Sequence, residues 1–264
     1  GECEMDCGGY FIVKGSEKTV LGQERAAENR VSVFDGKNTT KWTWYAEIKS
    51  VPDFKCISPK QIEMMIACKN NGFGHGLFIQ IPRIKQPIEL FVLFRALGII
   101  SDKEICQYIV LDIDDEKKTE LTNCLQASII DANKYMTQED AIKHIVSYVA
   151  YTPINMDKEK GQQKKREFTN EVLTNDLFPH CTTRTQKLYM LGYMANKLLQ
   201  TSLGWISPCD RDSYLNKRIE LTGTLLNNLF RNYFNKLVKE MQKQVVREIN
   251  NGSWRSSEDY ENII

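Results

Sequence analysis

The strongest constraint on the fold is a long apolar pattern toward the C-terminal end of the chain. Large apolar side chains recur there in two adjoining rows: Leu221, Leu225, Leu229, Tyr233 and Leu237 in one, and Leu226, Phe230, Phe234, Val238 and Met241 in the other. This spacing is typical of a single amphipathic helix with a 3.6-residue period. At about 1.5 Å per residue, the helix would be on the order of 50 Å long, enough to cross a whole domain.

A dense polar cluster stands directly before this pattern. Six charged or amide side chains fall within nine positions: Asp210, Arg211, Asp212, Asn216, Lys217 and Arg218. Such a cluster is either a solvated helix start or an ordered site of ion pairs and anion contacts. The residues alone leave both interpretations open.

Composition limits the partners that the chain can attract by charge alone. Its 264 residues are 42% hydrophobic and 26% charged, with a formal net charge of +1, as in a globular protein with a sizeable core. A nearly neutral chain has no global attraction to nucleic acid, so any DNA-facing role must rest on local patches. We expect no membrane partner, because no apolar run reaches the ~18 residues of a membrane helix.

The cysteines are dispersed along the chain and do not form a metal-binding motif. There are eight of them and no C-x-x-C pair; Cys3 and Cys7 are the one close pair. A zinc site at this pair is the less favoured interpretation, because a second close pair is missing nearby. We expect free thiols that act as small hydrophobic residues in a reducing compartment.

The rest of the chain shows a strand-rich part followed by a helix-rich part. Residues 10–21 read as strands around a turn at Lys14–Glu17, and residues 40–84 show further strand patterns. Helices are expected from Pro87 to a glycine cap at Gly98, from Ser101, and over 116–128, 137–150, 164–174 and 183–201. The basic segment 158–166 reads as an exposed linker, with a supplementary DNA-phosphate contact as the alternative.

Three segments resemble one protein family, in the same order. Residues 210–234, DRDSYLNKRIELTGTLLNNLFRNYF, are similar to the D-R-D-H-x-x-N/K-K-R-L-D-L-A-G-x-L-L segment of the second-largest, β-like subunit of multisubunit DNA-directed RNA polymerases. Residues 7–25, CGGYFIVKGSEKTVLGQER, and 86–99, QPIELFVLFRALGI, resemble two more of its motifs, and 191–199 match more weakly. Ser213 departs from the usual histidine, and Thr222 and Thr224 flank Gly223 where Ala-Gly is common, which suggests a divergent member of eukaryotic or large-DNA-virus type.

The resemblance implies an α+β fold built from two domains. Residues 36–205 would be a helix-rich lobe domain with a small antiparallel sheet. This lobe would be inserted into part of a protrusion domain made of residues 1–35 and 206–264, which carries the long C-terminal helix. The apolar stripe of that helix should then be buried against Tyr10, Ile12 and their neighbours.

The resemblance also implies the roles of individual residues. The turn before Lys18 lies close to the RNA–DNA hybrid in this family, so nucleic-acid contacts are expected for Lys18, Gln23, Arg25, Arg211, Lys217 and Arg218. The cations among these residues would contact phosphate without reading sequence. Asp210 and Asp212 would hold the arginines through structural ion pairs. Arg95, in an otherwise apolar run, would pair with a carboxylate rather than touch a ligand.

The expected function is that of a fragment of the polymerase's second-largest subunit. It would form one wall of the DNA cleft and a docking surface for initiation factors, with the other subunits, especially the largest, and DNA and the RNA–DNA hybrid as partners. No cofactor is expected here, because the Mg²⁺ of two-metal nucleotidyl transfer would be bound by the largest subunit. The isolated chain would be inactive, and the enzyme would work in the nucleus or cytoplasm, including a viral factory or virion. The alternative is a non-enzymatic interaction module that docks partners through the long amphipathic helix.

Overall fold

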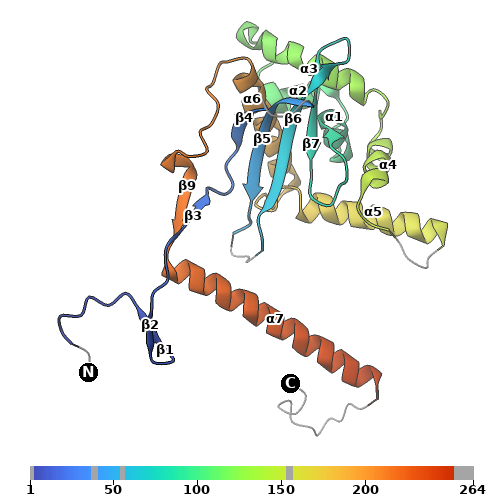
Figure 1. Ribbon diagram of the computed structural model, residues 1–264. Coiled ribbons are helices and arrows are strands. Elements are labelled where there is room, and N and C mark those ends of the chain that lie inside the picture. Colours follow the sequence, from blue (N-terminus) through green and yellow to red (C-terminus); the bar gives the residue numbers. More distant parts are fainter. Residues whose placement is uncertain (1–2, 37–40, 54–56, 153–156, 253–264) are drawn as a thin grey trace. The chain divides into compact units, whose positions relative to one another are not determined.

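The chain folds into two compact units. The computed structural model describes residues 3–36, 41–53, 57–152 and 157–252 (Figure 1). The larger unit is Ala27–Ser213, and the smaller unit combines the described residues up to Ala26 with those from Tyr214 onward. The larger unit is therefore inserted between two segments of the smaller one. Helices and antiparallel sheets occur together, which confirms the α+β class.

The division between the units does not coincide with the predicted domain limits. It falls after Ala26 and after Ser213. Strand β4 (Ser32–Asp35), which the sequence interpretation placed in the protrusion, pairs with β5 (Trp42–Ser50) in the main sheet of the larger unit. Because β4 pairs with β5 along its whole length, it belongs to the sheet of the larger unit. The limits of the lobe and protrusion domains themselves stay predictions.

The larger unit is built on a five-stranded antiparallel sheet. Its strands follow one another in space as they do in sequence: β4, β5, β6 (Lys60–Asn70), β7 (His75–Gln80) and β8 (Ile88–Glu89). Along β5 the buried positions alternate, with Ala46, Ile48 and Ser50 turned inward. One face of the sheet is therefore a core face.

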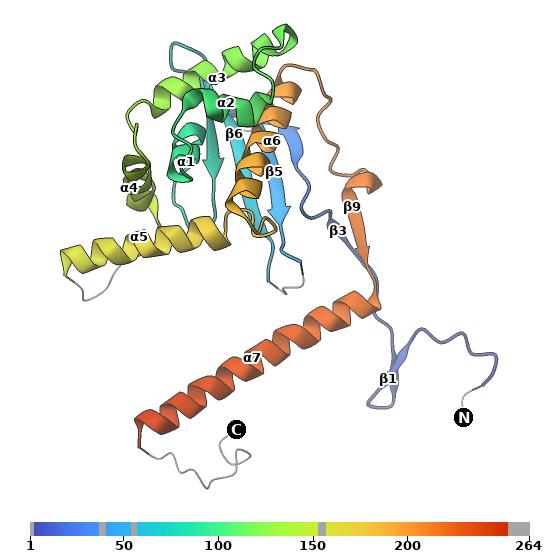
Figure 2. The same cartoon turned by 180° about the vertical axis from the view of Figure 1, so that it is seen from behind.

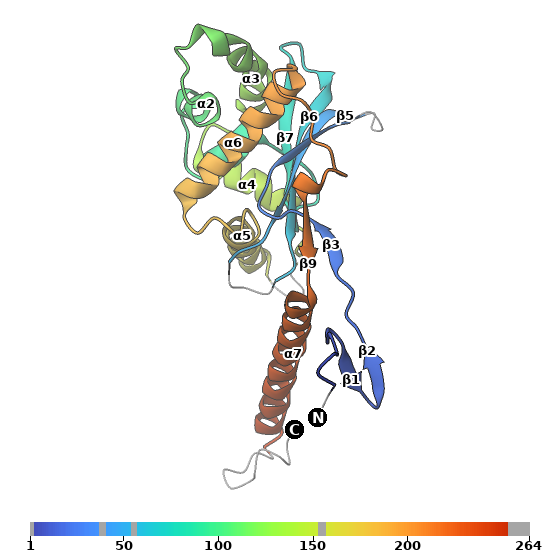
Figure 3. The same ribbon diagram turned by 90° about the vertical axis from the view of Figure 1, so that its left-hand side faces the viewer.

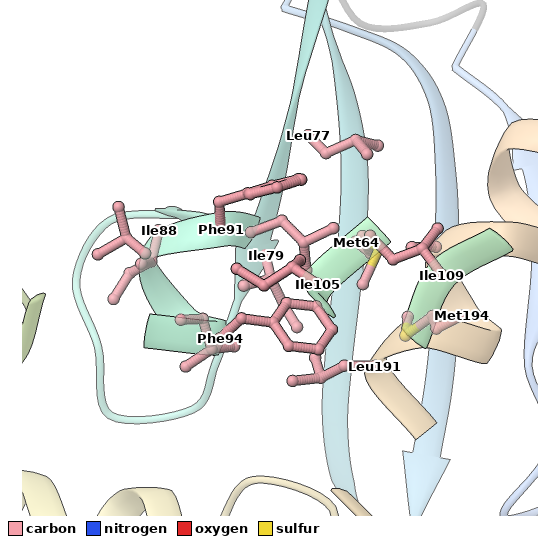
Figure 4. Close-up of a cluster of buried hydrophobic side chains, with 14 of the residues drawn as sticks. Met64, Leu77, Ile79, Ile88, Phe91, Phe94, Ile105, Ile109, Leu191 and Met194 are labelled. Carbon is pink, nitrogen blue, oxygen red and sulfur yellow. The ribbon is translucent and has the colours of Figure 1, made fainter. Parts of the chain in front are cut away.

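Helices cover that face of the sheet. They are α1 (Leu90–Ala96), α2 (Asp102–Val110), α3 (Thr119–Ala132), α4 (Gln138–Tyr148), α5 (Lys158–Asn175) and α6 (Arg184–Ser202), with a short 3₁₀ turn, η1 (Glu116–Lys118). The edge-on view in Figure 3 shows α2, α3 and α6 on one side of the strands. Figure 4 shows the side chains that interlock between the layers, among them Met64, Phe91, Phe94 and Leu191.

Helix α1 lies at the centre of this core. All seven of its residues are buried. Its last residue is Ala96, and Gly98 follows as the cap: the φ of Gly98 is +94° and its N–H donates to the carbonyl oxygen of Arg95, which confirms the predicted glycine cap. A β-carbon is unfavourable in this left-handed conformation, which is why glycine stands there.

One predicted linker is wrong. Residues 158–166 form the first half of helix α5 rather than a connection between elements. Most of their side chains are exposed, as expected, but Lys, Glu, Gln and Arg are good helix formers. Residues 158–166 can therefore form a helix without an apolar stripe, and the lack of such a stripe does not indicate a linker.

The smaller unit consists of two short ladders and a long helix. Strands β1 (Phe11–Val13) and β2 (Ser16–Lys18) form a hairpin. Its two-residue turn, Lys14–Gly15, has positive φ at both positions, as a type I′ turn requires, and confirms the predicted turn. Strand β3 (Gln23–Ala26) pairs with β9 (Lys217–Glu220), which follows a 3₁₀ turn, η2 (Tyr214–Asn216). Helix α7 (Thr222–Asn250) completes the unit.

Helix α7 confirms the predicted helix but not its predicted burial. It is described throughout its 29 residues, and none of them is buried. Leu229 is 53% exposed and Phe234 52%, while Ile12, an expected contact, is 61% exposed. The two ladders of the unit have strands of three or four residues that are themselves mostly exposed, so they offer too little apolar surface to cover the stripe. The expected packing on Tyr10 and Ile12 is therefore wrong.

Candidate nucleic-acid interface

The β3–β9 ladder brings together four of the predicted nucleic-acid residues. Its antiparallel register places Gln23 opposite Glu220 and Arg25 opposite Arg218. Side chains of directly opposed residues share a face of the ladder, and the faces alternate along each strand. Gln23, Arg25 and Arg218 therefore lie on one face together with Glu220, and Lys217 lies on the other.

A diagonal ion pair spans each face of this ladder. Arg25 Nε lies 3.0 Å from Glu220 Oε1, and Lys217 Nζ lies 2.8 Å from Glu24 Oε1. Both pairs are partly exposed, and exposed pairs typically contribute only about 0.2–1 kcal/mol. Such pairs therefore add only modestly to the stability of the ladder.

The face that carries Arg25, Arg218 and Glu220 is called the arginine face below. It has a second cation, Arg218, that Glu220 does not hold. Arg218 stands directly across the ladder from Arg25, and its Nη1 donates to the carbonyl oxygens of Lys217 (2.7 Å) and Leu215 (3.4 Å). Like charges directly opposite each other on a ladder destabilise it. A phosphate between the two guanidinium groups would relieve this repulsion and accept hydrogen bonds from both.

Lys18 stands apart from the ladder, on the β1–β2 hairpin of the same unit. It is exposed at the end of β2, opposite Phe11. A lysine on a short exposed hairpin can reach a phosphate as a mobile point charge. The β3–β9 register does not include it.

Arg211 belongs to the larger unit and is held on its sheet. Its guanidinium lies over the ring of Phe34, 4.0 Å from the centroid, and its Nη2 is 3.1 Å from both Tyr45 Oη and Glu47 Oε2. Burial lowers the pKa of Arg211, but the hydrogen bonds and negative charge of Tyr45 and Glu47 outweigh it and raise the pKa above its ordinary value. Arg211 is therefore a fixed cation on β4 and β5.

The carboxylate that pairs with Arg211 is Glu47, which the sequence interpretation missed. Asp210 accepts a hydrogen bond from the backbone N–H of Asp212 at 2.9 Å, so these two residues shape the turn around Arg211. The strand alternation contained the missing signal, because Tyr45 and Glu47 flank the buried Ala46 and must lie together on the outer face.

Arg95 is buried in the core of the larger unit. Its Nη2 donates to Asp102 Oδ1 at 2.6 Å, and its Nη1 donates to the carbonyl oxygens of Ala132 and Tyr135 at 2.6 and 2.9 Å. Only 1% of the Arg95 surface is exposed. These hydrogen bonds connect α1 to the start of α2 and to the end of α3. This environment gives a ligand no access to Arg95.

The described part of the chain offers neither a metal-binding cluster nor a membrane span. Across residues 3–36, 41–53, 57–152 and 157–252, no three His, Cys, Asp or Glu residues are grouped so as to hold a metal ion. Over the same ranges, no helix combines the length and the apolar character required to cross a membrane. The seven cysteines within these ranges are free thiols, and burial, together with the nearby Asp102 carboxylate, raises the pKa of Cys106 to about 11.

Comparison with known proteins identifies relatives along nearly the whole chain. The chain is 39% identical over 256 residues to the RNA polymerase II subunit RPB2 of Encephalitozoon cuniculi, and 32% identical over 260 residues to subunit 2 of the Arabidopsis thaliana enzyme. Each alignment covers 96% of this chain and 21% of the relative. A DNA-directed RNA polymerase subunit 2 of Acanthamoeba polyphaga mimivirus is 29% identical over 259 residues, covering 91% of this chain and 21% of that protein.

A family model locates the similarity on the structure. The model for RNA polymerase Rpb2, domain 2, matches residues 27–220, and its first residue is also the first residue of the larger unit. The chain spans about a fifth of the length of the relatives it matches. The resemblance inferred from the three motifs is thereby confirmed: the chain belongs to the RNA polymerase Rpb2 domain 2 family and is a fragment of a second-largest polymerase subunit.

Proposed function

We propose that this fragment forms one wall of the DNA cleft of a multisubunit RNA polymerase and contacts nucleic acid through phosphates. The observation that carries the proposal is the arginine face of the β3–β9 ladder, where Arg25 and Arg218 stand directly opposite each other. Gln23 adds an amide donor on the same face, and Lys18 and Lys217 add cations elsewhere in the same unit. Arg211 is a further cation, on the larger unit.

Phosphate is a better match for these groups than a base edge. Reading a base edge requires donors and acceptors held in a fixed pattern that matches one base pair. Arg25, Lys217 and Arg218 are instead each partly held by a neighbouring carboxylate or carbonyl group, and Lys18 is a mobile point charge. Contacts of this kind position a duplex or hybrid without specifying its sequence.

The fragment would act within the assembled enzyme. Its partners would be the other polymerase subunits, especially the largest, together with DNA and the RNA–DNA hybrid. Mg²⁺ would be bound by the largest subunit and would supply two-metal nucleotidyl transfer. The outer face of the larger unit would receive initiation factors, and the enzyme would work in the nucleus or, for a viral polymerase, in the cytoplasm or virion.

Helix α7 supports a second role alongside the first. No residue of its apolar stripe is buried, and Phe230 and Phe234 stack at a centroid distance of 5.8 Å. An amphipathic helix of this kind docks against an apolar groove of another element. This is the non-enzymatic interaction function, and it is compatible with a place in the polymerase.

The test of the phosphate proposal is the salt dependence of DNA binding by the purified chain. Binding to a fluorescein-labelled duplex should be weak, with a Kd of roughly 10⁻⁴ to 10⁻⁶ M, and should be independent of sequence. Replacing Lys18→Glu and Arg218→Glu together should weaken binding and reduce the slope of log K against log salt by about 0.9 per lost contact. Fluorescence anisotropy at several KCl concentrations measures both quantities.

A matched pair of reversals separates specific contacts from net charge. Lys69→Glu with Lys134→Glu changes the charge by the same amount at exposed positions of the larger unit. This variant should keep the wild-type slope. An equal reduction in both variants would show that only the overall charge matters and would refute a contact role for Lys18 and Arg218.

A further inference from the structure

Two hollows between helices of the larger unit share one wall. The first, of about 600 Å³, lies between α4 and α5 and includes Ile142, Val146 and Lys143 in its lining. The second, of about 280 Å³, lies between the end of α1, the end of α5 and the start of α6, and Ile142 lines it as well. Because they share Ile142, we treat them as one feature, the α4–α5 groove. Figure 2 shows α4 beside α5.

The floor of the α4–α5 groove is apolar. Ile142 and Val146 are half-buried on α4, at a spacing that places them on one side of that helix. Ala96, Leu97 and Leu173 continue the apolar lining in the smaller hollow. A ligand made only of phosphate and sugar would leave this floor without a partner.

The rim of the groove is strongly basic. Five cations line the two hollows: Lys143, Lys165, Arg166, Arg184 and Lys187. Among the described lining residues only Glu159 is acidic. Arg166 pairs with Glu139 at 2.9 Å, whereas no ion pair is seen for Lys143, Lys165 or Arg184 within the described residues. The potential at the groove is therefore positive in a chain whose net charge is almost zero.

Two of these cations have positions that the fold determines closely. Arg184 lies against Gly98, where an added β-carbon would stand 1.8 Å from its Nη2, so the glycine leaves room for the guanidinium. Lys187 is 5% exposed and donates from Nζ to the carbonyl oxygens of Leu173 and Thr174 at 2.9 and 2.5 Å. Those two bonds use two of its three N–H donors. Burial lowers the pKa of Lys187.

We propose that the α4–α5 groove docks an acidic, amphipathic segment of a partner protein. Apolar side chains of the segment would enter the hollows over Ile142 and Val146, and its carboxylates would pair with Lys143, Lys165 and Arg184. The combination of an apolar floor with a basic rim, three of whose cations form no ion pair within the described residues, is what selects this chemistry. The proposal is independent of the phosphate contacts of the smaller unit.

The experiment measures binding of a designed probe to the purified chain. The probe is a fluorescein-labelled 16-residue peptide with Leu and Phe at helical spacing and Asp or Glu between them. Saturable binding is expected, and Lys143→Glu with Arg184→Glu should weaken it about tenfold or more, since each lost attraction becomes a repulsion. The control, Lys103→Glu with Lys117→Glu, makes the same charge change at exposed positions outside the groove and should bind normally.

Two further measurements distinguish the proposed partner from other ligands. A peptide with Asn and Gln in place of Asp and Glu should bind much more weakly. The substitution Ile142→Ala should weaken binding of the acidic peptide without changing the circular dichroism spectrum of the chain. A 20-nucleotide single-stranded DNA should not displace the peptide. Absence of saturable binding, equal binding by the groove and control variants, or full displacement by DNA would each overturn the proposal.

Discussion

Helices α1 and α7 are both rich in large apolar residues, but their environments are opposite. Helix α1 has seven residues, all buried, and one of them is an arginine. Helix α7 has 29 residues and none buried, although its apolar stripe is the longest pattern in the sequence. An apolar pattern thus predicts a helix and the face of that helix that favours burial. Burial also requires a complementary surface, which strands β7 and β8 and helices α2, α3 and α4 of the larger unit supply to α1.

The largest expected effect is a difference in core energetics between two phenylalanines. Phe94 of α1 is fully buried and Phe234 of α7 is 52% exposed. Phe94→Ala should lower the free energy of unfolding of the larger unit by about 3–5 kcal/mol. Phe234→Ala, like Leu229→Ala, should change stability by less than about 0.5 kcal/mol, as is usual for exposed positions.

Urea denaturation measures both changes. Tryptophan fluorescence reports mainly on the larger unit, because three of the four tryptophans, Trp42, Trp44 and Trp205, belong to it. Circular dichroism at 222 nm follows all helices, α7 included. A loss of more than about 2 kcal/mol for Phe234→Ala would show that α7 has a buried face in the isolated chain.

A smaller effect is expected at two glycines near these helices. Gly98, after α1, has φ +94° and the Arg184 guanidinium against it, so Gly98→Ala should destabilise the larger unit by about 1–3 kcal/mol. Gly223, in the first turn of α7, has no heavy atom within 4 Å of an added β-carbon. Gly223→Ala should be neutral or stabilise α7 by up to about 1 kcal/mol. Thermal unfolding monitored by circular dichroism compares the two, and an equal loss at both sites would contradict the contrast between the helices.

The smallest effect is a pH dependence confined to the larger unit. The Nδ1 of His180 lies 2.6 Å from Oγ of the buried Ser50. Burial lowers the pKa of His180; the nearby Asp53 carboxylate opposes this shift, and Lys187 reinforces it. Between the lowered pKa and the ordinary value of 6.5, the unfolded chain binds more protons than the folded one. The stabilisation is therefore complete above pH 6.5 and is lost as the pH falls below it.

Urea titrations at pH 8 and at pH 5.5 test this prediction. The wild-type unit should lose more stability than a His180→Gln variant, which lacks the titrating ring. A His75→Gln variant, altered at the exposed start of β7, should follow the wild type. If His180→Gln and the wild type lose the same stability, another group carries the pH dependence.

Local features of the fold could be predicted from the sequence. The spacing of Leu221 to Met241 predicted α7, because helical periodicity depends on residues three and four apart. Gly98 predicted the end of α1, and Gly15 predicted the turn between β1 and β2, because each position requires a conformation that glycine adopts most easily. The three motifs were sufficient to identify the family.

Tertiary structure decided what covers each element and which charges meet. The partners of Arg211 and Arg95 are Glu47 and Asp102; Glu47 is 164 residues away in sequence, and nothing near Arg211 pointed to it. The register of β3 with β9 placed Arg25 opposite Arg218, and no local pattern specifies a pairing between strands so far apart. A helix satisfies its own backbone hydrogen bonds and so can be predicted from local sequence, whereas burial and ion pairing depend on surfaces contributed by distant segments.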